Sequence, residues 1–460
     1  MKKRVKIAVS LALAVLMLLP VMSTAITASA AGLLVYEITN PYDGVDFDTW
    51  NAYKAQLHVH TDASDGDVPV QTVVEEHYRL GYDILAITDH MTPNHGWDIA
   101  APAAPIMRLI KYERTKMAPI IPVTAKRYAE ITNGVGRDGR PMLDVPFGCE
   151  QNGAVPSNSH LNSFFVNYGQ GMIGVDNDFE TPVKAIKELG GNTFLNHVSE
   201  ATGAEKNPAV YERENVINKF ANLYLKYFPS LFAIDVSSGG DGATAIDRTV
   251  LYEKLLTKLI PYGVAPHLVT FSDAHQMGQW DRAFTIHMMK ESLEADNKDA
   301  AVADLKRSME DGTYFGISRS CRGGELPDDF VSDGITHPMV EDIIIGLNTI
   351  TIIPNGDTDG IAWVTNGGKV INEGEYTIDL AQFADDIESY VRPYLTGPGG
   401  ICYVQPFVTV PEGTTLKQGD LTYISDYSVY LRLFVDFLDK YFFQYNPLVK
   451  LFKQYVLGIN

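Results

Sequence analysis

The chain reads Gln56-Leu57-His58-Val59-His60-Thr61-Asp62-Ala63-Ser64-Asp65-Gly66 at positions 56–66, where a short apolar run gives way to polar residues. Successive side chains of a β-strand point to opposite faces, so His58 and His60 are expected on the same face. Two imidazoles in that arrangement can reach one metal ion. Asp65 follows five residues later and supplies a carboxylate from a turn. This stretch predicts a strand that ends in a metal site.

Short apolar runs alternate with amphipathic stretches from about Ala55 to Ser318. This pattern predicts strands at 56–60, 83–88, 161–167, 193–197, 232–236 and 268–272, and helices at 70–80, 181–189, 212–227 and 245–260. A βαβα order of this length favours a parallel sheet, open or closed into a barrel. The pattern alone does not choose between the two.

The pattern changes near residues 326–329. Three β-rich stretches follow at 341–354, 361–371 and 401–410, with glycine-containing turns between them. They predict a smaller, antiparallel, sandwich-like domain of about 100 residues that packs against the first part. An aromatic and aliphatic stretch from Tyr427 to Leu457 predicts a C-terminal amphipathic helix that docks on the body. An interfacial membrane or partner-binding helix is the alternative for this tail.

Imidazoles and carboxylates recur at the ends of the predicted strands, where α/β folds place their sites. Six of the eleven histidines and three acidic residues make up this set: His58, His60, Asp65, His90, Glu150, His160, His197, Asp273 and His275. Nitrogen and oxygen ligands without thiolates suit Zn, Mn or Fe, and nine ligands are too many for one tetrahedral ion. Two or three divalent ions are therefore predicted.

Other polar residues near these motifs receive supporting roles. Asp89 is expected to accept a hydrogen bond that orients a ligand histidine, and His95 is a candidate for contact with the substrate. Four arginines are interpreted either as a clamp for a substrate phosphate or as solvated surface residues: Arg137, Arg140, Arg319 and Arg322. Four histidines are interpreted as structural, the first of them on a helix surface: His77, His267, His287 and His337.

The motifs at 56–66, Ile87-Thr88-Asp89-His90 and Ser272-Asp273-Ala274-His275 resemble those of the polymerase-and-histidinol-phosphatase (PHP) family, and the resemblance covers about residues 54–318. Residues 147–150, 159–162 and 195–197 resemble the middle motifs of that family less tightly. The resemblance implies a distorted (β/α)7 TIM-like barrel with metal ions at the C-terminal strand ends. By the same resemblance, one ion is held by His58, His60, Glu150 and Asp273. Glu150 bridges to a second ion on His160 and His197, and a third ion is held by Asp65, His90 and His275.

The N-terminus predicts export. A basic segment ends at Lys6, an apolar run follows from Ile7 to Met22, and Ala28-Ser29-Ala30 offers a cleavage site after Ala30. An uncleaved anchor is the alternative. Cleavage removes four basic residues and no acid, so the formal charge falls from −20 to −24. A surface this acidic disfavours binding to nucleic acid or to an anionic membrane by bulk charge.

The predicted organisation has four parts: a signal peptide at 1–30, a PHP hydrolase domain at 31–325, a β-sandwich-like domain at 326–425 and an amphipathic helical tail at 426–460. Three cysteines, Cys149, Cys321 and Cys402, allow at most one internal disulfide, so no disulfide framework is expected. We find no Gly-x-Ser-x-Gly elbow and no P-loop in the sequence. No catalytic group is therefore expected beyond a metal-bound water.

These observations predict a secreted, metal-dependent phosphoesterase that hydrolyses mono- or diesters of a small or extracellular phosphorylated substrate. One alternative keeps the metal site but hydrolyses an amide, ester or carbamate. A second alternative is an exported glycan-binding protein, in which the metal cluster is structural and the β-rich domain contacts the glycan. Comparing phosphate esters with acyl esters and carbamates separates the first two hypotheses.

Overall fold

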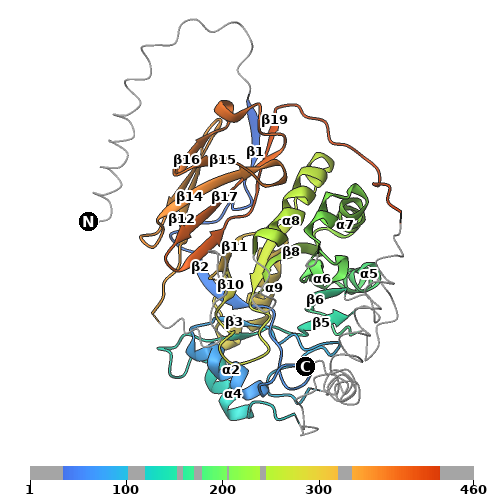
Figure 1. Cartoon of the computed structure of the whole chain (residues 1–460). Helices are drawn as coiled ribbons and strands as arrows, with labels where there is room; N and C mark the ends of the chain where they lie inside the picture. The colour runs from blue at the N-terminus through green and yellow to red at the C-terminus, as the bar shows by residue number, and fades with distance from the viewer. Residues whose placement is uncertain are drawn as a thin grey trace, which may run out of the picture. The chain divides into compact units, whose positions relative to one another are not determined.

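The computed structural model describes residues 35–101, 120–152, 159–169, 179–204, 207–238, 245–319 and 334–424 (Figure 1). The predicted signal peptide, the predicted tail at 426–460, Cys321 and Arg322 lie outside these residues. Among the described helices, none has the length and apolar character needed to cross a membrane.

Strands and helices alternate through the first part of the chain. Its strands are β2 (Asn51–Gln56), β3 (Ile84–Leu85), β4 (Leu143–Asp144), β5 (Cys149–Asn152), β6 (His160–Phe164), β7 (Asn192–Leu195), β8 (Leu231–Ser238), β9 (His267–Phe271), β10 (Ala283–Met289) and β11 (Tyr314–Ser318). Its helices are α2 (Val70–Arg79), α4 (Ala125–Thr132), α5 (Glu180–Leu189), α6 (Val198–Thr202), α7 (Glu214–Tyr227), α8 (Ala245–Leu259) and α9 (Lys298–Asp311). The mixed α/β class predicted from the sequence is therefore confirmed.

The second part is built of strands, as its sequence predicts. They are β12 (Val340–Ile345), β13 (Thr349–Pro354), β14 (Gly360–Thr365), β15 (Lys369–Glu373), β16 (Thr377–Asp379), β17 (Tyr390–Gly397), β18 (Gly400–Tyr403) and β19 (Phe407–Pro411). Every pairing among these described strands is antiparallel.

Short 3₁₀ turns occur in both parts of the chain. They are η2 (Pro208–Glu212), η3 (Ile260–Tyr262), η4 (Ala295–Asn297), η5 (Asn366–Gly368) and η6 (Leu380–Phe383).

The strands of the first part do not form the all-parallel sheet that the alternation favours. β2, β3 and β4 pair in parallel, and so do β7, β8 and β9. However, β5 pairs antiparallel with β6, and β6 pairs antiparallel with β7. Single parallel bridges, Val59 to Ala274 and His90 to Glu150, join the end of one sheet to the other. A closed barrel stays a prediction.

One sheet runs through both parts of the chain. It begins with β1 (Tyr36–Thr39), and its strand order is β1-β19-β17-β18-β11-β10-β2-β3-β4. β11 pairs with β18 across the predicted domain boundary. β1 pairs with β19, so an N-terminal strand completes the C-terminal β-rich region (Figure 1). The predicted boundary at residues 325 and 326 is therefore not a break in the sheet, and the domain limits stay predictions.

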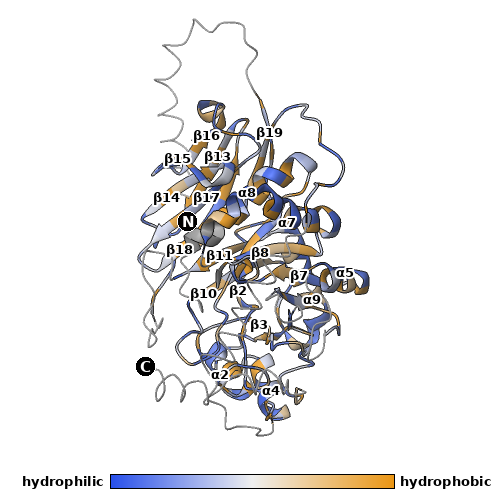
Figure 2. Ribbon diagram, turned by 45° about the vertical axis from the view of Figure 1, so that its right-hand side comes forward, coloured by the Kyte–Doolittle hydropathy of each residue, from blue (hydrophilic) through white to orange (hydrophobic). Residues whose placement is uncertain are grey.

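Helix α2 shows how the apolar pattern builds the core. It carries both hydrophobic and hydrophilic stretches (Figure 2), and its buried face consists of Val70, Val73, Val74, His77 and Tyr78. Fully burying a valine side chain contributes about 1.5–3 kcal/mol. The expectation of a surface position for His77 is wrong, because this face packs inward. His77 Nδ1 lies 2.7 Å from the Val73 carbonyl, and its ring meets that of Trp280 edge-on.

A buried ion pair joins α8 to the β-rich region. Arg392 on β17 donates from Nε to Glu253 Oε1 at 3.1 Å, and Tyr390 Oη donates to Glu253 Oε2 at 2.6 Å. Removing one partner of such a pair leaves an uncompensated charge and costs about 3–5 kcal/mol. The two parts therefore share a specific polar contact in addition to their common sheet.

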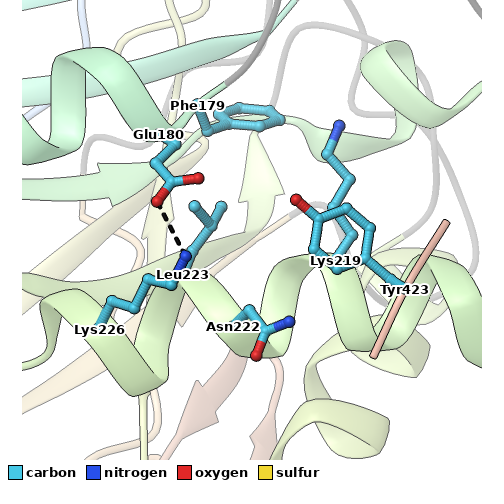
Figure 3. Close-up of a pocket in the computed structure, with 7 residues that line it drawn as sticks. All are labelled: Phe179, Glu180, Lys219, Asn222, Leu223, Lys226 and Tyr423. Carbon is cyan, nitrogen blue, oxygen red and sulfur yellow. Dashed lines mark hydrogen bonds and ion pairs between the residues drawn. The ribbon is translucent and has the colours of Figure 1, made fainter. Parts of the chain in front are cut away.

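The last described residues run along α7. Asn222 accepts from the Leu421 backbone N–H at 2.9 Å, and Asn218 donates to the Thr422 carbonyl at 2.9 Å. Tyr423 lies near Lys219, while Glu180 pairs with Lys226 across the same small pocket at 3.1 Å (Figure 3). These bonds hold the segment that follows β19 against the helical side of the first part.

Candidate metal centre

Two adjoining strand ends supply the first residues of the site. His58 and His60 follow β2, and Asp273 and His275 follow β9. The His60 N–H donates to the Ala274 carbonyl at 3.0 Å, beside the bridge between Val59 and Ala274. Backbone pairing therefore brings two motifs together that lie more than 200 residues apart in the sequence.

The middle motifs reach the same place through β3, β5, β6 and β7. The Met91 N–H donates to the Glu150 carbonyl at 2.8 Å, which holds the end of β3 against β5. His160 pairs with Asn152 across β5 and β6. The Asn196 N–H donates to the His160 carbonyl at 3.0 Å, so the residue before His197 is tied to the start of β6.

Four ligand atoms meet around His58 and His60. Their Nε2 atoms are 3.2 Å apart. Asp273 Oδ1 lies 3.1 Å from His58 Nε2 and 3.2 Å from His60 Nε2. Glu150 Oε2 lies 3.5 Å and 3.1 Å from the same two nitrogens. Ligand atoms about 2.1 Å from a tetrahedral ion stand about 3.4 Å from one another, so these separations suit one ion.

Glu150 presents its other oxygen to a second pair of imidazoles. Oε1 is 3.1 Å from His197 Nε2 and 3.4 Å from His160 Nδ1. One carboxylate thus faces two groups of nitrogens through two different atoms. This is the arrangement that a carboxylate bridging two ions requires.

Asp65 lies close to a third group of imidazoles. Its Oδ2 is 3.4 Å from His90 Nε2 and 3.4 Å from His275 Nε2, and its Oδ1 is 3.4 Å from His60 Nδ1. The structure therefore brings all nine predicted ligands into one cluster. Within the described residues, four groups have ligand atoms within 4.8 Å of one another: His60, Asp65, His90 and His275; His58, Glu150 and His197; His58, His60 and Asp273; His160, His197 and Glu200.

Several buried polar atoms of the cluster make no regular hydrogen bond, although the two carboxylate oxygens among them lie 3.1 Å from an imidazole nitrogen. Each is buried, and they are His58 Nδ1, Glu150 Oε2, His160 Nδ1, His197 Nδ1 and Asp273 Oδ1. A buried polar atom without a partner costs about 1–3 kcal/mol. Divalent cations would satisfy the carboxylate oxygens, so the residues fit the metal ions that the sequence predicts.

The cluster holds its carboxylates ionised. Burial raises the pKa of Glu150, but the imidazoles of His90 and His58 outweigh it and hold this pKa well below the usual range. The same balance applies to Asp65, where burial is opposed by His90 and His275 and the pKa is again well below its usual range. Burial lowers the pKa of His160 to about 4, which keeps this imidazole neutral. Burial also lowers the pKa of His60, His90 and His197, but the neighbouring carboxylates outweigh it and raise all three above the usual value. Metal binding would therefore displace protons from these imidazoles.

Unusual local backbone conformations position the carboxylates of Asp273 and Asp65. Asp273 adopts a φ of 49°, a left-handed conformation that costs a non-glycine residue of the order of 1–3 kcal/mol. Beside Asp65, a Cβ on Gly66 would lie 2.5 Å from the His60 carbonyl carbon. Glycine at 66 therefore lets the turn that carries Asp65 fold back onto the end of β2.

Residues 56–260 match the PHP domain family. The chain contains a PHP domain. The domain carries the clusters of His, Asp and Glu described above, which fit metal ions. None of the curated protein sequences matches the chain.

Solved structures with similar folds come from several kinds of protein. One is a two-domain protein from Bacteroides vulgatus that contains a predicted PHP-like metal-dependent phosphoesterase, with 16% identity over 85% of this chain and 92% of the other, and a TM-score of 0.40. A lesion-specific endonuclease from Pyrococcus furiosus has 11% identity over 56% of each chain, with a TM-score of 0.32. An amidohydrolase from Chromobacterium violaceum has 15% identity over 49% of this chain and 88% of its own, with a TM-score of 0.29. These values are too low to transfer a reaction.

Asp89 of the PHP domain supports the site differently from the prediction. Its carboxylate accepts from the Thr61 N–H at 2.8 Å, from the Thr61 hydroxyl at 2.6 Å and from the Ser64 hydroxyl at 2.6 Å. These bonds fix the turn between His60 and Asp65 and do not involve a histidine. The expected bond from Asp89 to a ligand imidazole is therefore corrected: the residue positions the loop that carries Asp65.

The arginines in the 134–140 loop lie away from the nine ligands. Arg137 Nη2 is 3.1 Å from Asp83 Oδ1, and Arg140 Nη2 is 2.6 Å from Asp83 Oδ2. Asp83 precedes β3 and His90 follows it, so the chain between them can span up to about 23 Å when extended. This position does not fit the predicted phosphate clamp, because Asp83 occupies both guanidinium groups.

The contacts of Arg319 are likewise with other residues of the protein. It is buried, pairs with Asp281 at 3.3 Å and donates to the carbonyls of Ile335 and Gly399 at 3.1 Å and 3.3 Å. Its predicted contact with a substrate does not fit these bonds. His95 is exposed, and its ring meets that of Phe147 edge-on at 5.3 Å. Contact between His95 and the substrate stays a prediction.

Sequence reasoning missed two residues that touch the ligands. Asn152 contacts His90 Nδ1 and His160 Nε2, each at 2.8 Å. Glu200 Oε1 lies 3.5 Å from His197 Nδ1. The spacing of His197 and Glu200 by three suits a shared helical face, but the five residues of α6 are too few for the sequence to predict the helix. For Asn152, its position two residues beyond Glu150 on a strand was the only signal.

Proposed function

We propose that the chain is a secreted, metal-dependent phosphoesterase that hydrolyses phosphate mono- or diesters through a metal-activated water, with two or three Zn, Mn or Fe ions in the PHP domain. The observation that carries the proposal is the position of Glu150. Its two oxygens face separate groups of imidazoles, with Oε2 3.1 Å from His60 Nε2 and Oε1 3.1 Å from His197 Nε2. Such a bridge supports neighbouring ions.

Adjacent divalent ions, when bound, lower the pKa of water and stabilise both the attacking and the leaving oxygen of a phosphoryl displacement. The protein residues then have to hold those ions and exclude competing ligands. Cys149 lies beside Glu150, but burial raises the pKa of its thiol well above the usual range, so it does not supply a thiolate nucleophile. Attack by water agrees with this environment.

The charge of the protein bears on the substrate. A mature chain with a formal charge of −24 repels anions at long range. Attraction of a phosphate would therefore depend on the cations in the cluster. We expect activity on small phosphate esters that can reach the cluster, and weaker activity at low salt, where repulsion by the surface is least screened.

The reaction is tested with the metal-loaded full chain. Rates are measured on p-nitrophenyl phosphate, bis-p-nitrophenyl phosphate, p-nitrophenyl acyl esters and p-nitrophenyl carbamates, and each is compared with the rate of His58→Ala. The proposal predicts turnover of a phosphate ester that falls by at least about 100-fold in His58→Ala. Turnover of acyl esters or carbamates alone would favour a carbonyl hydrolase. Glycan binding without any turnover would favour the non-catalytic alternative.

Export is tested separately. Secretion of the full-length chain with cleavage after Ala30 would give a mature protein that begins at Ala31, which N-terminal sequencing can read. A secreted product that retains Met1 would contradict the cleavage site without affecting the proposed reaction.

A further inference from the structure

Glu200 lies beside the metal centre although it is not among the nine predicted ligands. Its Oε1 is 3.5 Å from His197 Nδ1. It also forms a group with His160 and His197 in which the ligand atoms lie within 4.8 Å of one another. The side chain is 22% exposed, so it stands at the edge of the cluster and not on the open surface.

A short helix fixes Glu200 opposite His197. Helix α6 begins directly after His197, and the Glu200 N–H donates to the His197 carbonyl at 3.0 Å. Residues three apart on a helical turn share a face. Gly203 ends the helix with a φ of 72°, a conformation that glycine adopts without strain. The backbone thus holds the carboxylate beside the imidazole.

The two nitrogens of His197 face different carboxylates. Nε2 is 3.1 Å from Glu150 Oε1, at the position of a bridging ligand, whereas Nδ1 faces Glu200. A neutral imidazole carries one proton, and the nitrogen without it is the one that can bind metal. A carboxylate beside Nδ1 favours the proton on that atom, and a shift of about 0.5 Å would bring the pair to ordinary hydrogen-bond distance. The lone pair of Nε2 then points toward Glu150.

We propose that Glu200 is a positioning residue, which holds His197 in the tautomer and orientation that bind a divalent ion through Nε2. A direct ligand role is less consistent with the geometry, because Glu200 faces the nitrogen of His197 that points away from Glu150. The inference rests on the metal centre of the proposed function, but it does not depend on which bond the protein hydrolyses.

The test measures binding of Zn²⁺ alone to the metal-free full chain, by competition with a chromophoric chelator, together with the number of ions bound at saturation. Glu200→Ala removes the carboxylate, and Glu200→Gln keeps an oxygen that can accept from Nδ1–H. His160→Ala is the benchmark for loss of a direct ligand. Glu188→Ala on α5, where the side chain is 66% exposed, is the matched control. Thermal unfolding of each metal-free variant checks that the fold is retained.

Glu200→Ala is expected to bind the wild-type number of ions at saturation, but to bind one of them about 10–100-fold more weakly. Glu200→Gln should recover part of that loss, and Glu188→Ala should match the wild type. Wild-type affinity for every ion in Glu200→Ala would overturn the proposal. So would loss of one ion at saturation, as in His160→Ala, because that result identifies a direct ligand. A wild-type chain that binds no Zn²⁺ would overturn the metal centre itself.

Discussion

Asn152 accepts a hydrogen bond from His90, with its Oδ1 2.8 Å from the imidazole Nδ1. The bond places the proton of a neutral ring on Nδ1 and leaves Nε2 to face Asp65 Oδ2, 3.4 Å away. The amide nitrogen of Asn152 lies 2.8 Å from His160 Nε2. One buried amide therefore orients two residues that are predicted to bind different ions.

Replacing Asn152 with alanine is expected to weaken the binding of at least one ion by about 10–100-fold, because two imidazoles lose their orienting partner. Metal content after dialysis, measured by atomic emission, checks this prediction. Asn133→Ala provides the control. Asn133 is exposed at the end of α4, and its side-chain amide donates to the Ala129 carbonyl of the same helix. Equal metal content in Asn152→Ala and the wild type would contradict the orienting role.

Removing the metal is expected to destabilise the chain. Asp65, Glu150 and Asp273 are brought together in the folded state, and an ion that binds only this state at 100 times its Kd adds about 2.7 kcal/mol. For a chain of this size, the entropy of unfolding is about 1 kcal/mol per kelvin, so that corresponds to a fall in Tm of about 3 °C on chelation. Differential scanning calorimetry with EDTA, followed by addition of excess Zn²⁺ or Mn²⁺, measures the fall and its recovery. A Tm that chelation leaves unchanged would argue against a metal-supported cluster.

Most of the metal ligands could be predicted from the sequence because they lie at strand ends and follow the spacing of a strand. His58 and His60 alternate at the end of a strand, and Asp273 and His275 repeat the pattern after β9, so local spacing is enough to predict a shared face. Which residues then meet is set by the pairing of strands. The bridge from His90 to Glu150 is one such contact, and no local pattern predicts it.

Residues that depend on loop conformation or distant pairing were predicted less well. Asp89 binds Thr61 and Ser64 because the turn after β2 folds over it, whereas its sequence neighbour His90 suggested an imidazole partner. The pairing of β1 with β19 joins residues more than 360 positions apart, and short β-rich segments do not encode their partners. Glu200 was missed because α6 has only five residues, too few to show a helical pattern.

Asp83 is expected to be a stability residue of the PHP domain and not part of a substrate site. It is fully buried, accepts from the Lys54 N–H at 3.0 Å and pairs with both Arg137 and Arg140. Asp83→Ala leaves Arg137 without a carboxylate partner and should lower the free energy of unfolding by about 3 kcal/mol, measured by urea denaturation. Metal content should not change.

Arg140→Ala gives the complementary measurement. The Arg140 side chain is 55% exposed, so the loss of its ion pair should cost less than about 1 kcal/mol. If Arg140 binds only Asp83 and does not contact the substrate, the KM for a phosphate ester stays at the wild-type value. A KM raised about tenfold would restore the phosphate-clamp interpretation of this loop.

His287 is expected to make the stability of the chain depend on pH. This residue of β10 is buried, with Nδ1 2.9 Å from Ser308 Oγ and Nε2 3.0 Å from Thr285 Oγ1. Burial, helped by the charge of Arg307, lowers its pKa to about 3, whereas the pKa in the unfolded chain is about 6.5. The folded state therefore binds fewer protons between these values. The stability contribution is fully present above pH 6.5 and is lost as the pH falls toward 3.

Between pH 6.5 and 5 this loss amounts to about 2 kcal/mol for the free energy of unfolding. His287→Asn removes the titration, although it also lowers stability at pH 7 by removing packing and hydrogen bonds. The difference in free energy of unfolding between the wild type and the variant should therefore shrink by about 2 kcal/mol from pH 7 to pH 5. Urea denaturation of both proteins in the metal-free state measures it, since acid would otherwise also release metal. A difference that stays constant over this range would show that the folded state protonates His287 as readily as the unfolded chain does.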